Sequence, residues 1–183
     1  MTKHLLLGVV VVLAACGGRG EPEEAGARPV PGEARPAAPW SAAPLDASAV
    51  PGVYPAEWRA AENRGTCALI APVTVARADA VPRAATFSGG WGVAYDLPDQ
   101  RSAFGIAGTG TTPGPGTYDA WPHRIEWRDG STAGYGPEGG SGPSQLAYVE
   151  ITGQDCLYNV WSRLGVDHLE WLLGQLRFVA IGS

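Results

Sequence analysis

Arg124-Ile125-Glu126-Trp127-Arg128, then Asp129-Gly130, then Ser131-Thr132-Ala133-Gly134-Tyr135, is the stretch that decides the predicted fold. Before the Asp-Gly pair, apolar and charged side chains alternate, which is typical of a strand with one buried face. Asp-Gly between two such segments favours a two-residue type I′ turn. The stretch therefore predicts an antiparallel β-hairpin. One face of its first strand carries Trp121, His123, Ile125 and Trp127, and the other carries Arg124, Glu126 and Arg128.

Further strands are predicted on both sides of this hairpin, because short apolar or alternating segments are separated by turn-forming residues. These segments are 67–75, 91–95, 102–108, 145–152 and 156–161. Two Gly/Pro-rich loops, 108–116 and 136–144, lie between them. The repeated pattern predicts an antiparallel sheet of at least six strands.

A helix is predicted near the C-terminus. Leu169, Leu172, Leu173 and Leu176 recur at helical spacing, which gives one apolar stripe. Asp167 is placed to cap the start, with Glu170 three residues later completing a capping box. A shorter helix is predicted over 55–65, and a last strand over 177–181.

These elements predict an α+β domain over residues 51–183, an antiparallel β-sheet with the C-terminal helix packed on it. A small β-sandwich or barrel with one helix is the alternative, since strand pattern alone does not distinguish an open sheet from a closed one.

The N-terminus has the marks of an export signal. Lys3 precedes an apolar segment, 5–15, that is too short to span a bilayer. The following Leu13-Ala14-Ala15-Cys16 resembles the lipobox of bacterial lipoproteins. That resemblance implies removal of the signal peptide, residues 1–15, and attachment of lipid, palmitate included, to Cys16. With Gly17 after the cysteine, it implies a lipid-anchored envelope protein on the outer membrane or facing the periplasm.

Residues 16–50 are predicted to be the lipidated cysteine and a disordered tether. The segment is rich in proline and alanine and holds few branched or aromatic residues, so burial cannot offset its ordering entropy. Trp40 is the one residue that does not fit this composition, and we interpret it as a stray apolar side chain rather than a docking point.

The cysteines predict one disulfide bond. With Cys16 lipidated, only Cys67 and Cys156 remain, and an exported protein with two cysteines most simply pairs them. Two cysteines are also too few for a thiolate zinc site without several suitably placed histidines. We predict no metal and no cofactor.

The charge balance excludes one class of partner. Loss of Lys3 with the signal peptide leaves twelve arginines against 18 acidic residues, a net charge of −6, without a basic stripe. Such a chain is not expected to bind nucleic acid. Gly139-Gly140-Ser141-Gly142-Pro143 and Gly108-Thr109-Gly110 each break the glycine-rich catalytic or nucleotide-binding motif that they begin.

The chain contains histidines and carboxylates that could act in catalysis, but their spacing matches no catalytic motif. His123 is predicted to be partly buried in the sheet, and His168 to lie at the surface beside the helix cap. The carboxylates considered for acid–base work are Asp119, Glu126, Glu150 and Asp155. An extracytoplasmic hydrolase is therefore the alternative function.

Aromatic residues are numerous for a domain of this size. They either fill the core or form a surface on the sheet that stacks on sugar rings or on a partner. Near the two loops, Tyr118, Trp121 and Tyr135 are the candidate ligand-binding residues. The sequence favours a non-enzymatic binding or structural module for a glycan or an envelope protein.

Overall fold

The computed structural model describes residues 34–87, 89–110, 121–140, 142 and 144–182. It confirms the α+β class, with open rather than closed sheets. The larger sheet has seven strands in the order β3-β4-β5-β9-β8-β7-β6, all antiparallel to their neighbours. Their bounds are β3 Val81–Ala84, β4 Trp91–Leu97, β5 Gln100–Gly108, β6 His123–Glu126, β7 Thr132–Pro137, β8 Gln145–Glu150 and β9 Leu157–Ser162.

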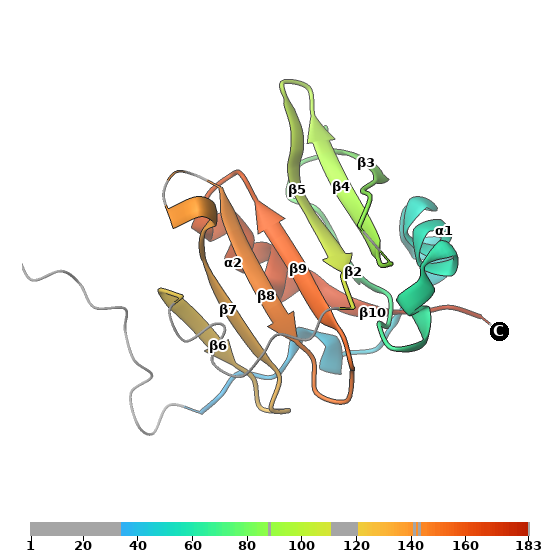
Figure 1. Cartoon of the computed structure of the whole chain (residues 1–183), viewed down its shortest axis with the longest axis horizontal. Coiled ribbons are helices and arrows are strands. Elements are labelled where there is room, and N and C mark those ends of the chain that lie inside the picture. The colour runs from blue at the N-terminus through green and yellow to red at the C-terminus, as the bar shows by residue number, and fades with distance from the viewer. Residues whose placement is uncertain (1–33, 88, 111–120, 141, 143, 183) are drawn as a thin grey trace, which may run out of the picture.

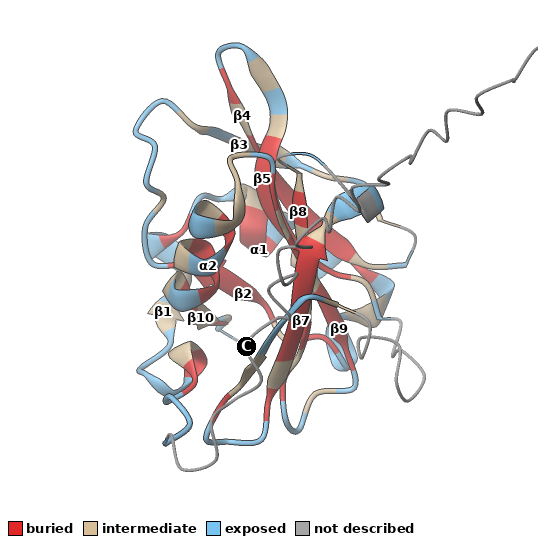
Figure 2. Ribbon diagram, turned by 90° about the vertical axis from the view of Figure 1, so that its left-hand side faces the viewer, coloured by how far each residue is buried: buried red, intermediate tan, exposed pale blue. Residues whose placement is uncertain are grey.

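A second layer covers one face of this sheet. It consists of two helices, α1 Val53–Ala60 and α2 Val166–Gln175, and a three-stranded sheet in the order β1-β10-β2. The strands are β1 Leu45–Asp46, β2 Ile70–Pro72 and β10 Leu176–Ala180. Figure 2 shows this layer to the left of β7, β8 and β9, with buried residues between the two layers. Among the described residues, no helix is long and apolar enough to cross a membrane.

The core lies between the layers because every second residue of the central strands points toward the helices. Ala147, Val149, Tyr158 and Val160 are buried on β8 and β9, where they face α2. The leucine stripe meets them: Leu169, Leu172 and Leu173 on α2, and Leu176 where β10 begins, are each at most 1% exposed. This apolar stripe explains why α2 packs as predicted. Single-turn 3-10 helices complete the described chain at Pro39–Ser41, Ala47–Ala49, Glu62–Gly65 and Glu138–Gly140.

The predicted hairpin is present as β6 and β7, but its turn differs from the prediction. The Trp127 N–H donates to the Ser131 carbonyl and the Gly130 N–H to the Trp127 carbonyl, which gives a three-residue loop. Only Gly130 has a positive φ, of 87°, whereas a type I′ turn needs a second one at Asp129. His123 is exposed and stacks on Tyr135, so the prediction that it is partly buried in the sheet is wrong.

The start of α2 also differs from the prediction. The helix begins at Val166 with Gly165 as its N-cap residue, at φ 98°. Asp167 therefore lies inside the first turn. Its negative charge interacts favourably with the helix N-terminus, but its side chain is not the cap. Glu170 accepts a hydrogen bond from the Tyr135 hydroxyl at 2.7 Å instead of completing a capping box.

The chain joins the domain well before Pro51, contrary to the predicted extent of the tether. Trp40 is 5% exposed and packs edge-on against Trp127, with ring centroids 4.8 Å apart. Its Nε1–H donates to Asp129 Oδ2 at 2.9 Å, and β1 pairs in parallel with β10. Residues 38–50 thus form a belt across the domain, because Trp40 supplies the large apolar area that the composition otherwise lacks.

The predicted disulfide is present. Cys67 and Cys156 are bonded, and both are buried. The bond joins the segment before β2 to the segment before β9, so it connects the two layers. Cys16 and the signal peptide lie outside the described residues.

Candidate functional site

The face of the large sheet away from the helices is the candidate site. Figure 1 looks onto this sheet with α2 behind it. On β8 and β9, the residues that alternate with the core positions are Leu146, Tyr148, Asn159 and Trp161, and all four are partly exposed. Leu146 is directly opposite Trp161, and Tyr148 is opposite Asn159. We call this the outer face.

Aromatic rings on the outer face lie across glycines of neighbouring strands. The Trp161 ring covers Gly105 so closely that a β-carbon there would overlap it. The Phe87 ring covers Gly92 in the same way, where a β-carbon would be 2.6 Å from the ring. Phe87 and Trp161 are themselves neighbours, with centroids 6.0 Å apart. Glycines without side chains therefore let these rings lie flat along the sheet.

These side chains line an open groove of about 530 Å³. Its apolar part is formed by the rings of Phe87, Tyr148 and Trp161 together with Leu146. Its polar groups are Ser102, Glu138, Ser144, Asn159 and Arg163. An apolar surface with a few placed polar groups is the usual composition of a ligand site.

Asn159 lies in the middle of this face. Its Oδ1 is shielded from solvent and has no hydrogen-bond partner in the described part of the chain. A buried acceptor without a donor costs about 1–3 kcal/mol. A hydroxyl or N–H group of a ligand that reached this amide would remove that cost.

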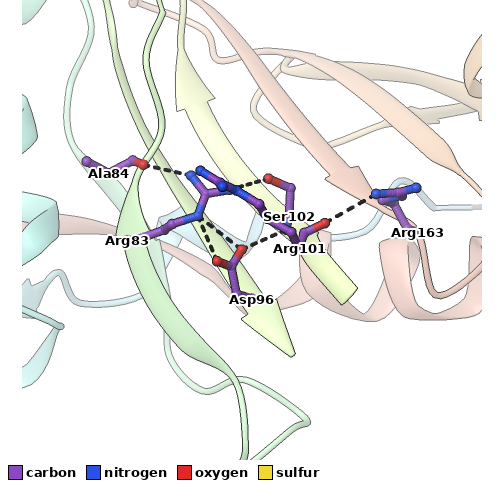
Figure 3. Close-up of polar contacts among 6 residues, drawn as sticks. All are labelled: Arg83, Ala84, Asp96, Arg101, Ser102 and Arg163. Atoms are coloured by element: carbon purple, nitrogen blue, oxygen red, sulfur yellow. Dashed lines mark hydrogen bonds and ion pairs between the residues drawn. The ribbon is translucent and has the colours of Figure 1, made fainter. Parts of the chain in front are cut away.

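The polar end of the groove is organised around a bulge in β5. The pairing of β4 with β5 shifts between Tyr95 and Leu97, and Ser102 has a φ of 51°. Asp96 accepts a hydrogen bond from the Ser102 backbone N–H at 2.7 Å and forms an ion pair with Arg83 at 2.9 Å. The Ser102 N–H and then Arg83 lower the pKa of Asp96. Figure 3 shows these contacts, with Arg83 and Arg163 on either side of the Arg101–Ser102 backbone.

The structure separates the residues proposed from the sequence. Trp121 lies at the rim of the outer face, over Gly136 and edge-on to Tyr148 at 5.4 Å. Tyr135 is 6% exposed and faces the helix layer, so it does not line the groove. Burial, and then Glu170, raise its pKa. Tyr118 lies outside the described residues.

Sequence reasoning did not single out the groove residues Phe87, Tyr148 and Trp161. Tyr148 and Trp161 alternate with core residues on their strands, and this alternation was the sequence signal that could have placed them on the outer face. The pairing that places Leu146 beside Trp161 depends on strand register, and the sequence does not specify it.

A serine and a histidine come together elsewhere, in an arrangement unsuited to nucleophilic catalysis. Ser162 Oγ and His168 Nδ1 are 3.0 Å apart, but Ser162 is 0% exposed and points toward the helix layer. Its oxygen also accepts the Leu164 N–H at 3.0 Å, which binds the loop before α2. Because no substrate can reach the hydroxyl, the pair joins β9 to α2 structurally.

His168 should make stability depend on pH. Burial, and then the charge of Arg77, lower its pKa below the ordinary value of 6.5. The unfolded chain therefore takes up a proton before the folded one, so stability is complete above pH 6.5 and declines as the pH falls below it. The slope is at most about 1.4 kcal/mol per pH unit. Urea unfolding between pH 5 and 7.5 measures it.

The matched variants are His168→Gln and His123→Gln. The first should remove this part of the slope, whereas the second, at an exposed position, should keep it. An unchanged slope in His168→Gln would contradict the assignment.

Among the described residues, no group of three or more histidine, cysteine, aspartate or glutamate side chains is placed to hold a metal ion. Comparisons of the chain with protein-family models, with curated proteins and with solved structures each found no match.

Proposed function

We propose that this chain is a lipid-anchored binding module of the bacterial cell envelope and that it holds a glycan in the groove of the outer face. The observation that carries the proposal is the set of partly exposed aromatic rings, Phe87, Tyr148 and Trp161, on the sheet face opposite the helices. Sugar rings present C–H groups that pack on aromatic faces, while their hydroxyls bond to polar groups around them.

The form of the groove supports a sugar chain as the ligand. The groove is open, and its floor is a paired sheet, so its rings are held in place before a ligand arrives. Ordered rings lose little conformational entropy on binding. Ser102, Ser144 and Asn159 add neutral polar groups suited to hydroxyls.

Binding is better supported than hydrolysis. Glycoside hydrolysis generally uses two carboxyl groups on either side of the bond that is cut. Among the described lining residues, Glu138 is the one carboxylate. The serine that lies beside a histidine, Ser162, is buried on the other face.

Two features support an envelope location. Leu13-Ala14-Ala15-Cys16 resembles a lipobox, and a buried disulfide between Cys67 and Cys156 is typical of an oxidising compartment. An anchor on Cys16 would carry the domain on a tether that ends at the belt formed by residues 38–50. The belt's tryptophan, Trp40, packs on Trp127.

Replacing Trp161 with alanine should weaken glycan binding at least about tenfold, because the ring supplies much of the apolar floor. The measurement is affinity gel electrophoresis of the full chain, purified in detergent, against soluble peptidoglycan fragments and a panel of polysaccharides. Trp171→Ala is the matched control, since Trp171 is also partly exposed but lies on α2, behind the sheet.

The outcomes separate the possibilities. Binding that survives in Trp161→Ala as well as in Trp171→Ala would place the ligand elsewhere. If the wild-type chain binds none of the glycans, the proposal fails in favour of a protein partner, which cross-linking in the intact envelope would then identify.

A further inference from the structure

Arginines gather at the polar end of the groove, although the chain as a whole is acidic. Arg83, Arg101 and Arg163 gather around the β5 bulge, where the carboxylate of Asp96 contacts Arg83. Asp96 is already paired with Arg83. Among the described residues, neither Arg101 nor Arg163 has an ion-pair partner. Of these two, Arg163 lines the groove, so its charge remains available there.

Arg163 is the arginine that lines the groove. It is exposed, and its Nη1 donates to the Arg101 carbonyl at 3.2 Å, which orients the guanidinium. A guanidinium has five N–H donors in a planar fork, so this single bond leaves donors for a ligand. Such forks match the geometry of a carboxylate.

Ser102 lies beside Arg163 in the groove lining and is held in an unusual conformation. It is the one non-glycine residue with a positive φ in the described part of the chain. Its Oγ accepts a hydrogen bond from Arg83 Nη2 at 2.5 Å, which leaves its hydroxyl proton free to donate. A conformation of this kind is strained and is found disproportionately at binding sites.

We infer that the groove takes an acidic glycan, with the anionic group of one sugar against Arg163 and Ser102 and neighbouring rings on Trp161 and Phe87. This inference rests on the proposed function and adds the chemical class of its ligand. The aromatic floor supplies affinity for the rings, and the arginine end selects for charge.

Glu138 is the opposing charge in the groove and supplies a second test. It is exposed and forms no ion pair with Arg163 among the described residues. Its carboxylate should therefore repel an anionic ligand rather than neutralise Arg163. Variants at these two positions should change binding in opposite directions.

The experiment compares acidic polysaccharides with their own carboxyl-reduced derivatives. Polygalacturonate, alginate and hyaluronate would each be tested before and after reduction by affinity electrophoresis of the full chain. The wild-type chain should bind at least one acidic form about tenfold more tightly than its neutral counterpart. The difference should shrink in 0.5 M salt, where exposed charges are screened.

Arg163→Gln should lose the preference for the acidic form and keep the affinity for the neutral form within about twofold. Glu138→Gln should strengthen binding of the acidic form about two- to fivefold. Arg177→Gln is the matched control, because Arg177 also bonds to backbone carbonyls but lies on β10, in the other layer. It should leave both affinities unchanged.

Equal affinity for the acidic and reduced forms, or a preference that persists in Arg163→Gln, would overturn the inference and leave the glycan proposal standing. Absence of binding to every polysaccharide, acidic or neutral, would instead overturn the proposed function itself. The two failures are thus distinguishable in one set of measurements.

Discussion

Replacing both Cys67 and Cys156 with alanine is expected to lower the free energy of unfolding by about 4 kcal/mol. The two cysteines are 89 positions apart, and a bond across so long a loop restricts the unfolded chain strongly. The bond also joins the two layers beside hydrogen bonds of Ala68 with Gln154 and with the Tyr158 hydroxyl. The midpoint of thermal unfolding should fall by roughly 10 °C.

Thermal unfolding followed by circular dichroism, with and without a reducing agent, measures this effect. The reduced wild-type chain and the double variant should unfold at similar temperatures, since both lack the bond. The single variant Cys67→Ala should be at least as unstable, because it leaves a buried thiol at Cys156. A melting temperature that reduction does not change would contradict the expected role of the bond.

Replacing Trp40 with alanine is expected to cost about 3–5 kcal/mol, as for other buried tryptophans. The side chain is 5% exposed, packs on Trp127 and donates a hydrogen bond to Asp129. Its loss would leave a cavity under the belt and one fewer donor for the Asp129 carboxylate. The belt, residues 38–50, should then separate from the domain more readily.

Urea unfolding of three variants divides this cost into its parts. Trp40→Phe keeps a ring but loses the N–H donor, so it should cost less than Trp40→Ala. Pro44→Ala is the control, since Pro44 is exposed in the same belt and should have little effect. If residues 38–50 were a disordered tether, as their composition predicts, Trp40→Ala would leave stability unchanged.

Asp129 connects this belt to the hairpin. Burial alone would raise its pKa, but hydrogen bonds from the Ser131 N–H and from Trp40 outweigh burial, so the pKa is lowered. A carboxylate whose pKa is lowered in the folded state stabilises it above the ordinary pKa of aspartate, and this contribution is lost in acid. The belt is therefore held by an interaction between residues 89 positions apart.

Features that depend on neighbouring residues were predictable from the sequence, whereas features that depend on contacts between distant residues were not. Local alternation was sufficient for the hairpin strands, because side-chain direction in a strand follows from neighbouring residues. The leucine stripe was sufficient for α2, for the same reason at helical spacing. Cap positions were not predictable in this way, since Asp167 and Gly165 are both acceptable at a helix start. In the structure Gly165 is the N-cap residue, and Glu170 accepts a hydrogen bond from the distant Tyr135.

The groove was predictable only in kind. Aromatic residues on a sheet face indicated a binding surface. The alternation within each strand, however, does not reveal whether Tyr135 or Trp121 lies on the face that the helices cover. Once α2 packs on one face, Tyr135 becomes core, and Tyr148 and Trp161 remain accessible. The position of the covering layer is a long-range property.

By itself, the sequence determined the α+β class, the disulfide pairing, the C-terminal helix and the resemblance of its first sixteen residues to a lipoprotein signal. Each of these depends on composition, on periodicity over a few residues, or on a count of two cysteines. Only the tertiary structure decided that Trp40 is core, that Tyr135 is buried, and that Phe87, Trp161, Ser102 and Arg163 share one groove. The physical reason is strand register, which brings together residues far apart in the chain and which local side-chain preferences do not encode.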